Sequence, residues 1–319
     1  KKSACYLSLL LLTAPLVATA EQSDPALVQT TLAQLSVNCP ELAAGVDFPT
    51  MMSLQAFYEQ NAGQDVWSDD ERRMALQAQL QQLADDGLDP ARYSLPAEGT
   101  AQNPHCVDIA ISQRYLQALF ELRFGYLPQD RLEPVWKADP LPQDRQAEVL
   151  AIAGSGLHDL DEAFEQARPS LALYRNLREL YARQRQQPLP EWQPVPGGPL
   201  LHPDKRGARV PALAQRLFSE GYLSAPPVII DDHYNPDLVA AMKSFQLHHS
   251  LQADGVVGPW TVTELNISPF MRREQLRVNL ERMRWLARDL EPDSVLVNVA
   301  AARLTVYQDG APVWQTRTQ

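Results

Sequence analysis

The sequence predicts a mainly α protein that ends in a short β segment. Apolar residues recur at helical spacing along most of the chain before Pro292, and residues that start or stop helices flank these periodic segments. After Pro292 the pattern changes to the alternation of apolar and polar residues that is typical of strands. With 319 residues, of which 45% are hydrophobic, the chain is long enough for two or three domains with buried cores.

The first 20 residues have the three parts of a secretory signal. Lys1-Lys2 precedes an apolar run at residues 7–12, and small residues lead to Ala20. We expect cleavage after Ala20 and a periplasmic or cell-envelope location, with no membrane contact after cleavage. An uncleaved membrane anchor stays open as an alternative, although the apolar run is short for a span.

Cysteine usage agrees with export. Cys5 lies inside the predicted signal, which leaves Cys39 and Cys106 as an even pair. A disulfide between them would stabilise the fold by about 4 kcal/mol in the chain-entropy model. Two separate buried thiols are the alternative, because sequence cannot show that the two Cβ atoms meet.

Residues 21–186 are predicted to form a helical domain. One helix starts after Trp67, with Ser68 as the N-cap and Glu71 closing a capping box. A second runs over residues 107–124 with one apolar face, and a third covers residues 171–185.

A proline-rich linker, residues 187–203, follows and rules out a continued helix. Residues 204–268 then predict a three-helix bundle with a rigid turn at residues 254–259. We expect a connecting helix over residues 269–292 and the first strands of a β domain over residues 293–319, where Asp309-Gly310 signals a hairpin.

Several classes of site are disfavoured. The net charge of −11 argues against nucleic acid as a partner. Asp85 and Asp86 lie beside a turn and are predicted to be solvated rather than catalytic. Adjacent histidines, His248-His249, point apart on a helix, so we expect no metal and no cofactor.

The long basic helix has a separate interpretation. Its arginines are scattered around residues 271–288, which predicts a solvated or interdomain-packed helix with Arg277 and Glu281 as an i,i+4 ion pair. Contact with an anionic cell-wall polymer is the alternative.

The order of motifs resembles secreted bacterial L,D-transpeptidases, which have a helical scaffold, a peptidoglycan-binding module and a β-rich cysteine catalytic domain. The similarity covers nearly the whole chain after the signal, and it is carried by the order and spacing of short motifs. These are Phe57-Tyr58, Trp67, Asp86-Gly87-Leu88-Asp89-Pro90, Tyr93, Phe245-Gln246, Asp254-Gly255, Gly258-Pro259, Thr261, Asn279-Leu280-Glu281-Arg282, Arg284-Trp285, Val297-Asn298-Val299, Leu304 and Tyr307.

This resemblance implies acyl transfer between peptidoglycan stem peptides through a cysteine thioester. The family's cysteine lies in a Ser-His-Gly-Cys motif, and this sequence contains none. His105-Cys106 lacks the surrounding motif. We therefore expect no catalytic residue in this chain, inactivity as it stands, and a catalytic domain truncated at its start, with the nucleophile beyond Gln319.

Peptidoglycan stem peptides and glycan strands are the expected partners. The resemblance suggests a shallow groove beside the turn of the binding module, contacted by Tyr234, Lys243, Gln246, Trp260 and Thr261. The alternative is that Trp260, like Phe245, is a core residue. Two other functions remain open, namely a non-catalytic peptidoglycan-binding protein and a peptidoglycan hydrolase that shares the module, such as a zinc-dependent one.

Overall fold

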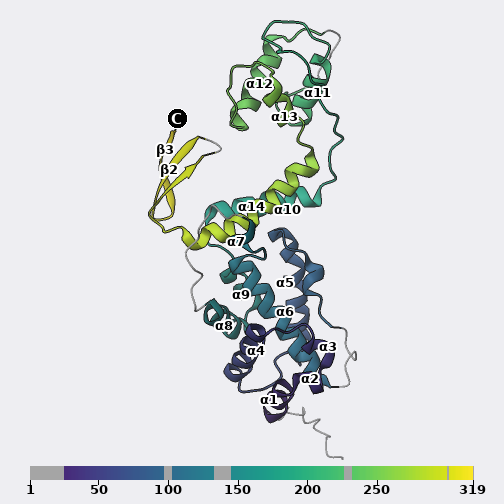
Figure 1. The fold of residues 1–319 in the computed structure, drawn as a ribbon, viewed down its shortest axis with the longest axis vertical. Helices are drawn as coiled ribbons and strands as arrows, with labels where there is room; N and C mark the ends of the chain where they lie inside the picture. Colours follow the sequence, from purple (N-terminus) through teal and green to yellow (C-terminus); the bar gives the residue numbers. More distant parts are fainter. Residues whose placement is uncertain (1–24, 97–102, 133–144, 226–231, 300–301, 319) are drawn as a thin grey trace, which may run out of the picture.

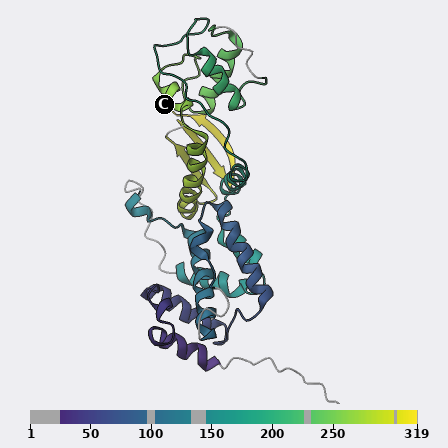
Figure 2. The ribbon, with the colours of Figure 1, turned by 90° about the vertical axis from the view of Figure 1, so that its right-hand side faces the viewer.

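The computed structural model describes residues 25–96, 103–132, 145–225, 232–299 and 302–318. They form the mainly α structure with a small β segment that the sequence predicts. The molecule is elongated, with a lower helical body, a middle tier made of α10, α14 and the sheet, and an upper module of α11 to α13 (Figure 1, Figure 2). The predicted signal, residues 1–20, lies outside the described residues.

The elements, in chain order, are α1 Pro25–Ala33, α2 Leu35–Asn38, α3 Pro40–Ala43, α4 Phe48–Gln60, α5 Asp70–Gln82, the 3₁₀ turns η1 Leu83–Asp86 and η2 Pro90–Tyr93, α6 Pro104–Phe124, α7 Gln129–Leu132, α8 Arg145–Gly156, α9 Leu160–Ala167, α10 Ala172–Gln186, α11 Val210–Ser219, α12 Pro236–His248, α13 Pro259–Leu265, α14 Pro269–Asp289, β1 Ser294–Asn298, β2 Arg303–Gln308 and β3 Ala311–Arg317. Within these elements, none of the helices is both long and apolar enough to cross a bilayer.

Helix α6 lies at the centre of the lower body. Its predicted apolar face is buried, with Ile109, Leu116 and Leu119 all below 8% exposure. The helix begins three residues earlier than predicted, because the Asn103 side chain accepts a hydrogen bond from the backbone N–H of His105 and acts as the N-cap.

The N-cap of α5 differs from the predicted residue. Ser68 was predicted as the N-cap, but Asp69 has this role: its carboxylate accepts from the N–H of Glu71 at 2.9 Å. Serine and aspartate cap about equally well, and the aspartate charge also interacts favourably with the positive end of the helix dipole. The predicted capping box is therefore wrong, because the third residue after Asp69 is Arg72 rather than a glutamate or glutamine.

A disulfide joins Cys39, between α2 and α3, to Cys106 in the first turn of α6, with a Cα–Cα distance of 5.7 Å. It links the N-terminal helices to the central helix of the body. Both cysteines are at most 7% exposed.

Asp86 is the centre of a buried ionic cluster below α10. Its carboxylate accepts from Arg168 Nε and Nη2 at 3.1–3.2 Å, from the Tyr174 hydroxyl at 2.9 Å and from Arg178 Nε at 2.9 Å. Burial alone would lower the pKa of Arg168, but Asp86 holds it above its ordinary value. The prediction of a solvated residue is wrong for Asp86, because α9 and α10 bring two arginines onto it from a distant part of the sequence.

Helix α14 joins this cluster from above. Arg284, 1% exposed, donates to the backbone carbonyl of Asp86 and to Glu281 Oε2, the latter at 2.7 Å. Glu281 Oε1 accepts from the backbone N–H groups of Tyr126 and Leu127 at 2.6 and 2.7 Å. We call the cluster formed by Asp86, Arg168, Tyr174, Arg178, Glu281 and Arg284 the joint.

The joint also corrects the predicted ion pair. Arg277 pairs with Glu274 at 2.9 Å rather than with Glu281. Glu281 instead accepts from Arg284 and from the backbone N–H groups of Tyr126 and Leu127. The basic helix is therefore packed between domains over its second half, which is one of the two interpretations that the sequence allowed.

In the upper module, α11, α12 and α13 pack around Phe245, Leu217 and Val257, all fully buried. The predicted linker contributes to the same core. Val195 is buried, and its backbone N–H and carbonyl both bond to the Asn266 side chain at 2.8 and 3.0 Å. Leu201 forms a bridge with Val257.

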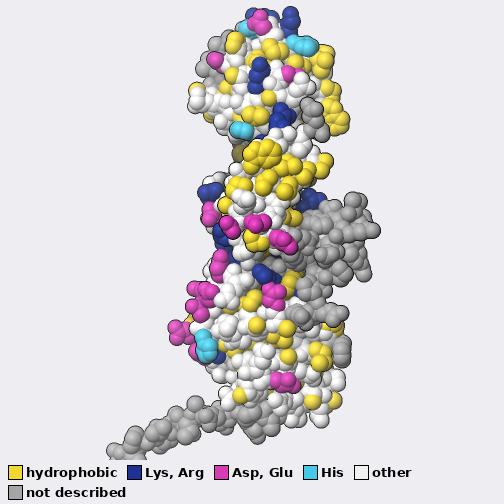
Figure 3. Space-filling view, turned by 90° about the vertical axis from the view of Figure 1, so that its left-hand side faces the viewer, with side chains coloured by type: hydrophobic (Ala, Val, Ile, Leu, Met, Phe, Trp, Pro, Cys, Tyr) yellow, Lys and Arg dark blue, Asp and Glu magenta, His cyan; other side chains and the backbone are white. Residues whose placement is uncertain are grey.

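The sheet is antiparallel with strand order β1-β2-β3. The predicted Asp309-Gly310 hairpin is confirmed, and both residues have positive φ. Val306 lies opposite Val295 and Trp314, so these residues share one face. Val295 and Trp314 are 60% and 55% exposed. Figure 3, viewed from the side of the sheet, shows hydrophobic side chains gathered below the upper module.

Candidate functional site

The turn at residues 254–258 is held from inside the module by two buried side chains. Gln246 Oε1 accepts from the N–H of Gly255 at 2.8 Å, and its Nε2 donates to the carbonyl of Val256 at 3.0 Å. The Tyr234 hydroxyl donates to the carbonyl of Gly255 at 2.8 Å. Burial raises the pKa of Tyr234 above its ordinary value, so this hydroxyl remains a donor.

Gly255 cannot easily be replaced in this turn. Its φ is +80°, and a Cβ there would lie 3.0 Å from Val239 and 3.2 Å from Lys243 Cε. The aliphatic part of Lys243 therefore lies against the turn, while the residue as a whole is exposed.

Trp260 and Thr261, adjacent at the start of α13, point in opposite directions. Thr261 is 5% exposed and its hydroxyl lies 3.4 Å from Gln246 Nε2, whereas Trp260 is 80% exposed. Of the five residues predicted from the sequence, Tyr234, Gln246 and Thr261 thus shape the turn from within. Lys243 and Trp260 are those that reach solvent.

Residues 206–265 match the family model described as "Putative peptidoglycan binding domain". Residues 52–180 match a second model, described as "Scaffold domain". The two matches support a cell-wall-associated protein. The first points to peptidoglycan as a partner and to the cell envelope as the location. No curated protein matches the chain.

The scaffold motifs hold the lower body together. Asp108 accepts from the N–H groups of Val66 and Trp67 at 3.2 and 2.7 Å and from the Tyr58 hydroxyl. Ser112 accepts from Trp67 Nε1 at 2.9 Å. Burial raises the pKa of Asp108 to about 6, although these hydrogen bonds oppose the shift. The side chains of this network point into the core and do not line a described cleft, so we assign it a structural role.

His105 and the tandem histidines have local partners. His105 Nδ1 lies 2.9 Å from Asp65, and His249 Nδ1 lies 3.0 Å from Glu264. His248 Nδ1 lies 3.2 Å from the Tyr222 hydroxyl. Among the described residues, no cluster of three or more His, Cys, Asp or Glu side chains is arranged to hold a metal ion.

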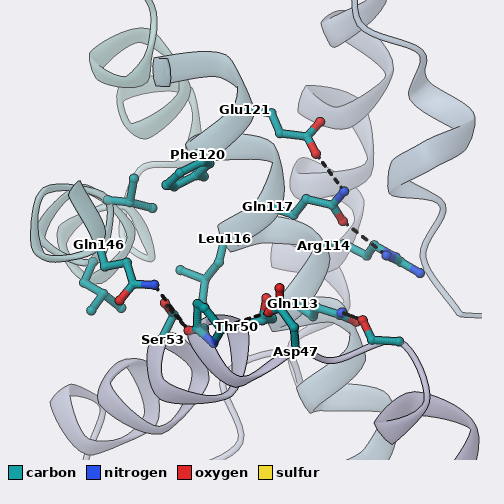
Figure 4. Close-up of a pocket in the computed structure, with 14 residues that line it drawn as sticks. Asp47, Thr50, Ser53, Gln113, Arg114, Leu116, Gln117, Phe120, Glu121 and Gln146 are labelled. Carbon is teal, nitrogen blue, oxygen red and sulfur yellow. Dashed lines mark hydrogen bonds between the residues drawn. The ribbon is translucent and has the colours of Figure 1, made fainter. Parts of the chain in front are cut away.

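A groove of about 480 Å³ lies between α4, α6 and α8 (Figure 4). Its floor includes Leu116 and Phe120, and sequence reasoning gave no indication of it. Its polar side chains mostly bond within the fold: Gln117 bonds Glu121 at 2.9 Å, and Gln146 bonds the carbonyl of Pro49 at 3.4 Å.

A second cleft, of about 470 Å³, separates the upper module from α14. Its arginines come from α11 and α14. Arg216 pairs with Glu220, and Arg272 pairs with Glu264 at 2.7 Å. Arg273 lines the same cleft and is half-buried. The sequence interpretation counted Arg273 among the scattered arginines, and no local pattern distinguished it from them.

Proposed function

We propose that this chain binds peptidoglycan through its upper module, with Trp260 and the stem of Lys243 forming the contact surface beside the turn. The observation that carries the proposal is the 80% exposure of Trp260 within the segment that matches the peptidoglycan-binding model. Tryptophan is enriched at binding interfaces, because it combines a large apolar surface with a polar N–H group.

The rigid turn supports this proposal. Gln246 and Tyr234 fix the backbone of the turn, so Trp260 and Lys243 are presented on a pre-organised surface. Pre-organisation lowers the entropy cost of binding. Lys243 adds one positive charge that complements the carboxylates of stem peptides.

A sedimentation assay with purified cell-wall sacculi tests the proposal. Trp260→Ala should weaken binding by roughly tenfold or more, because aromatic residues at the centre of interfaces often contribute 2 kcal/mol or more. Trp314→Ala is the matched control, since Trp314 is also exposed but lies on the sheet. Lys243→Ala is compared in the same way with Lys205→Ala, an exposed lysine elsewhere in the module. Equal binding of the Trp260 and Trp314 variants would refute the proposal.

At a finer level, we propose that the chain is the scaffold and wall-binding portion of a peptidoglycan L,D-transpeptidase. The order of its motifs and the two matched models support this assignment. The nucleophile is not expected among the described residues, because Cys39 and Cys106 are joined in a disulfide. A non-catalytic binding protein is equally compatible with the matches.

Two experiments test the finer assignment. A carbapenem should form no covalent adduct with this chain in mass spectrometry, whereas an adduct on either cysteine would require a reactive cysteine site. Sequencing the reading frame downstream of Gln319 separates the alternatives. A Ser-His-Gly-Cys motif there would support a transpeptidase, a stop codon the non-catalytic binding protein, and a His/Glu constellation a metal-dependent hydrolase.

A further inference from the structure

The cleft between the upper module and α14 contains an arginine, Arg273, for which the described residues supply no counter-ion. The described part of the chain provides Arg273 with no hydrogen-bond or ion-pair partner. The acids around it are already engaged: Glu264 bonds Arg272, Glu274 bonds Arg277, and Glu220 bonds Arg216. The cleft therefore carries one positive charge that none of the described acidic residues neutralises.

The other cations of the cleft are fixed in place by the fold. Arg216 donates to the carbonyls of Leu265 and Ile267 at 2.8 and 3.0 Å, besides its pair with Glu220. Arg272 donates to the carbonyl of Glu264 at 3.0 Å. These arginines have structural partners that a ligand would have to displace, whereas the guanidinium of Arg273 is available.

The rest of the cleft is suited to a short peptide. Leu189 from the linker and Leu276 from α14 provide apolar surface in the cleft. Asn279 lines the same cleft with a neutral amide. Ligand sites in proteins combine an apolar lining with a few polar groups that fix orientation, and a guanidinium binds a carboxylate with two parallel hydrogen bonds.

We propose that this cleft binds a carboxylate of a peptidoglycan stem peptide through Arg273. This inference rests on the proposed function, because it takes the stem peptides of peptidoglycan as the ligand. It adds a second contact outside the segment that matches the peptidoglycan-binding model, since Arg273 belongs to α14. The module surface and the cleft would then engage the wall together.

Calorimetry with soluble muropeptides, released from sacculi by a muramidase, tests the proposal. Arg273→Gln should weaken binding by roughly tenfold or more, as expected for the loss of a hydrogen-bonded charge. Arg282→Gln is the matched control: it removes the same charge from an exposed position of α14 that does not line the cleft. That variant should bind within about twofold of the unmodified chain.

A chemical variant of the ligand supplies the second arm. Amidation of the muropeptide carboxylates should weaken binding to the unmodified chain and have little further effect on Arg273→Gln, because the two changes remove the same interaction. Unmodified affinity in Arg273→Gln, or an equal amidation effect in both proteins, would overturn the inference. Competition by inorganic phosphate at a similar concentration would overturn the assignment to a carboxylate.

The outcomes also separate this inference from the proposed function. If the unmodified chain binds neither sacculi nor muropeptides, the proposed function fails. If the chain binds, and Trp260→Ala weakens binding while Arg273→Gln does not, only the cleft assignment fails.

Discussion

Replacing Asp86 should destabilise the protein far more than replacing its neighbour Asp85. The Asp86 carboxylate is fully buried and receives hydrogen bonds from Arg168, Tyr174 and Arg178 at 2.9–3.2 Å. Asp86→Asn would leave the buried Arg168 guanidinium with only the exposed Glu165, at 3.2 Å, as its counter-ion, and would also remove the partner of the partly exposed Arg178. Breaking a buried pair in this way costs about 3–5 kcal/mol.

Asp85 provides the matched control. It pairs with Arg185 at 2.6 Å, and both side chains are partly exposed, at 21% and 39%. An ion pair of this kind contributes about 0–1 kcal/mol. The two substitutions change the same residue type at adjacent positions, so they differ mainly in burial and in the number of partners.

Urea unfolding followed by far-ultraviolet circular dichroism measures both free energies of unfolding. We expect the transition that includes the lower body to lose about 3 kcal/mol or more in Asp86→Asn and at most about 1 kcal/mol in Asp85→Asn. Melting temperatures should follow, with a fall of about 10 °C for Asp86→Asn. Equal, small losses in the two variants would refute the argument that Asp86 neutralises the buried arginines.

Three further outcomes are expected. Burial raises the pKa of Asp108 from 3.8 to about 6, so the folded state binds this proton more tightly than the unfolded state and loses stability as the pH rises through that range. Between about pH 5 and pH 7.5 the free energy of unfolding should fall by about 1.4 kcal/mol more than in Asp108→Asn, and parallel curves of that free energy against pH would contradict this. Denatured but unreduced protein should show no alkylation of Cys39 or Cys106 by mass spectrometry, and labelling of both would show that the disulfide does not form. Replacing both cysteines by serine should lower the free energy of unfolding by about 4 kcal/mol. Deleting residues 293–319 should leave the melting temperature of the helical parts nearly unchanged and reduce aggregation seen by light scattering, because the apolar face with Trp314 is exposed. A large fall in that melting temperature would show that the sheet packs onto the helices.

Helix positions could be predicted well because their signals are local. The apolar face of α6 and the Asp309-Gly310 hairpin each depend on residues that are close in sequence. Errors at the helix starts arose where neighbouring residues could serve equally as caps, as at Ser68 and Asp69.

The buried charges could not be predicted in the same way. Arg284 is 198 residues away from Asp86 in sequence, so no periodic pattern indicates that α14 reaches it. For the binding module, the sequence indicated the neighbourhood of the turn. Whether Gln246 points inward and Trp260 outward depends on how α12 and α13 pack together, which is a tertiary property.

The attachment of α14 at both ends has a mechanical consequence. This helix has 21 residues and so spans about 30 Å. Its first turn contacts the upper module through the bond from Arg272 to Glu264, and Arg284 near its other end is locked into the joint. Helix α14 therefore holds the upper module at a fixed distance from the joint. A pulling force applied to the module by a stretched cell wall would be transmitted through this helix to the buried cluster around Asp86.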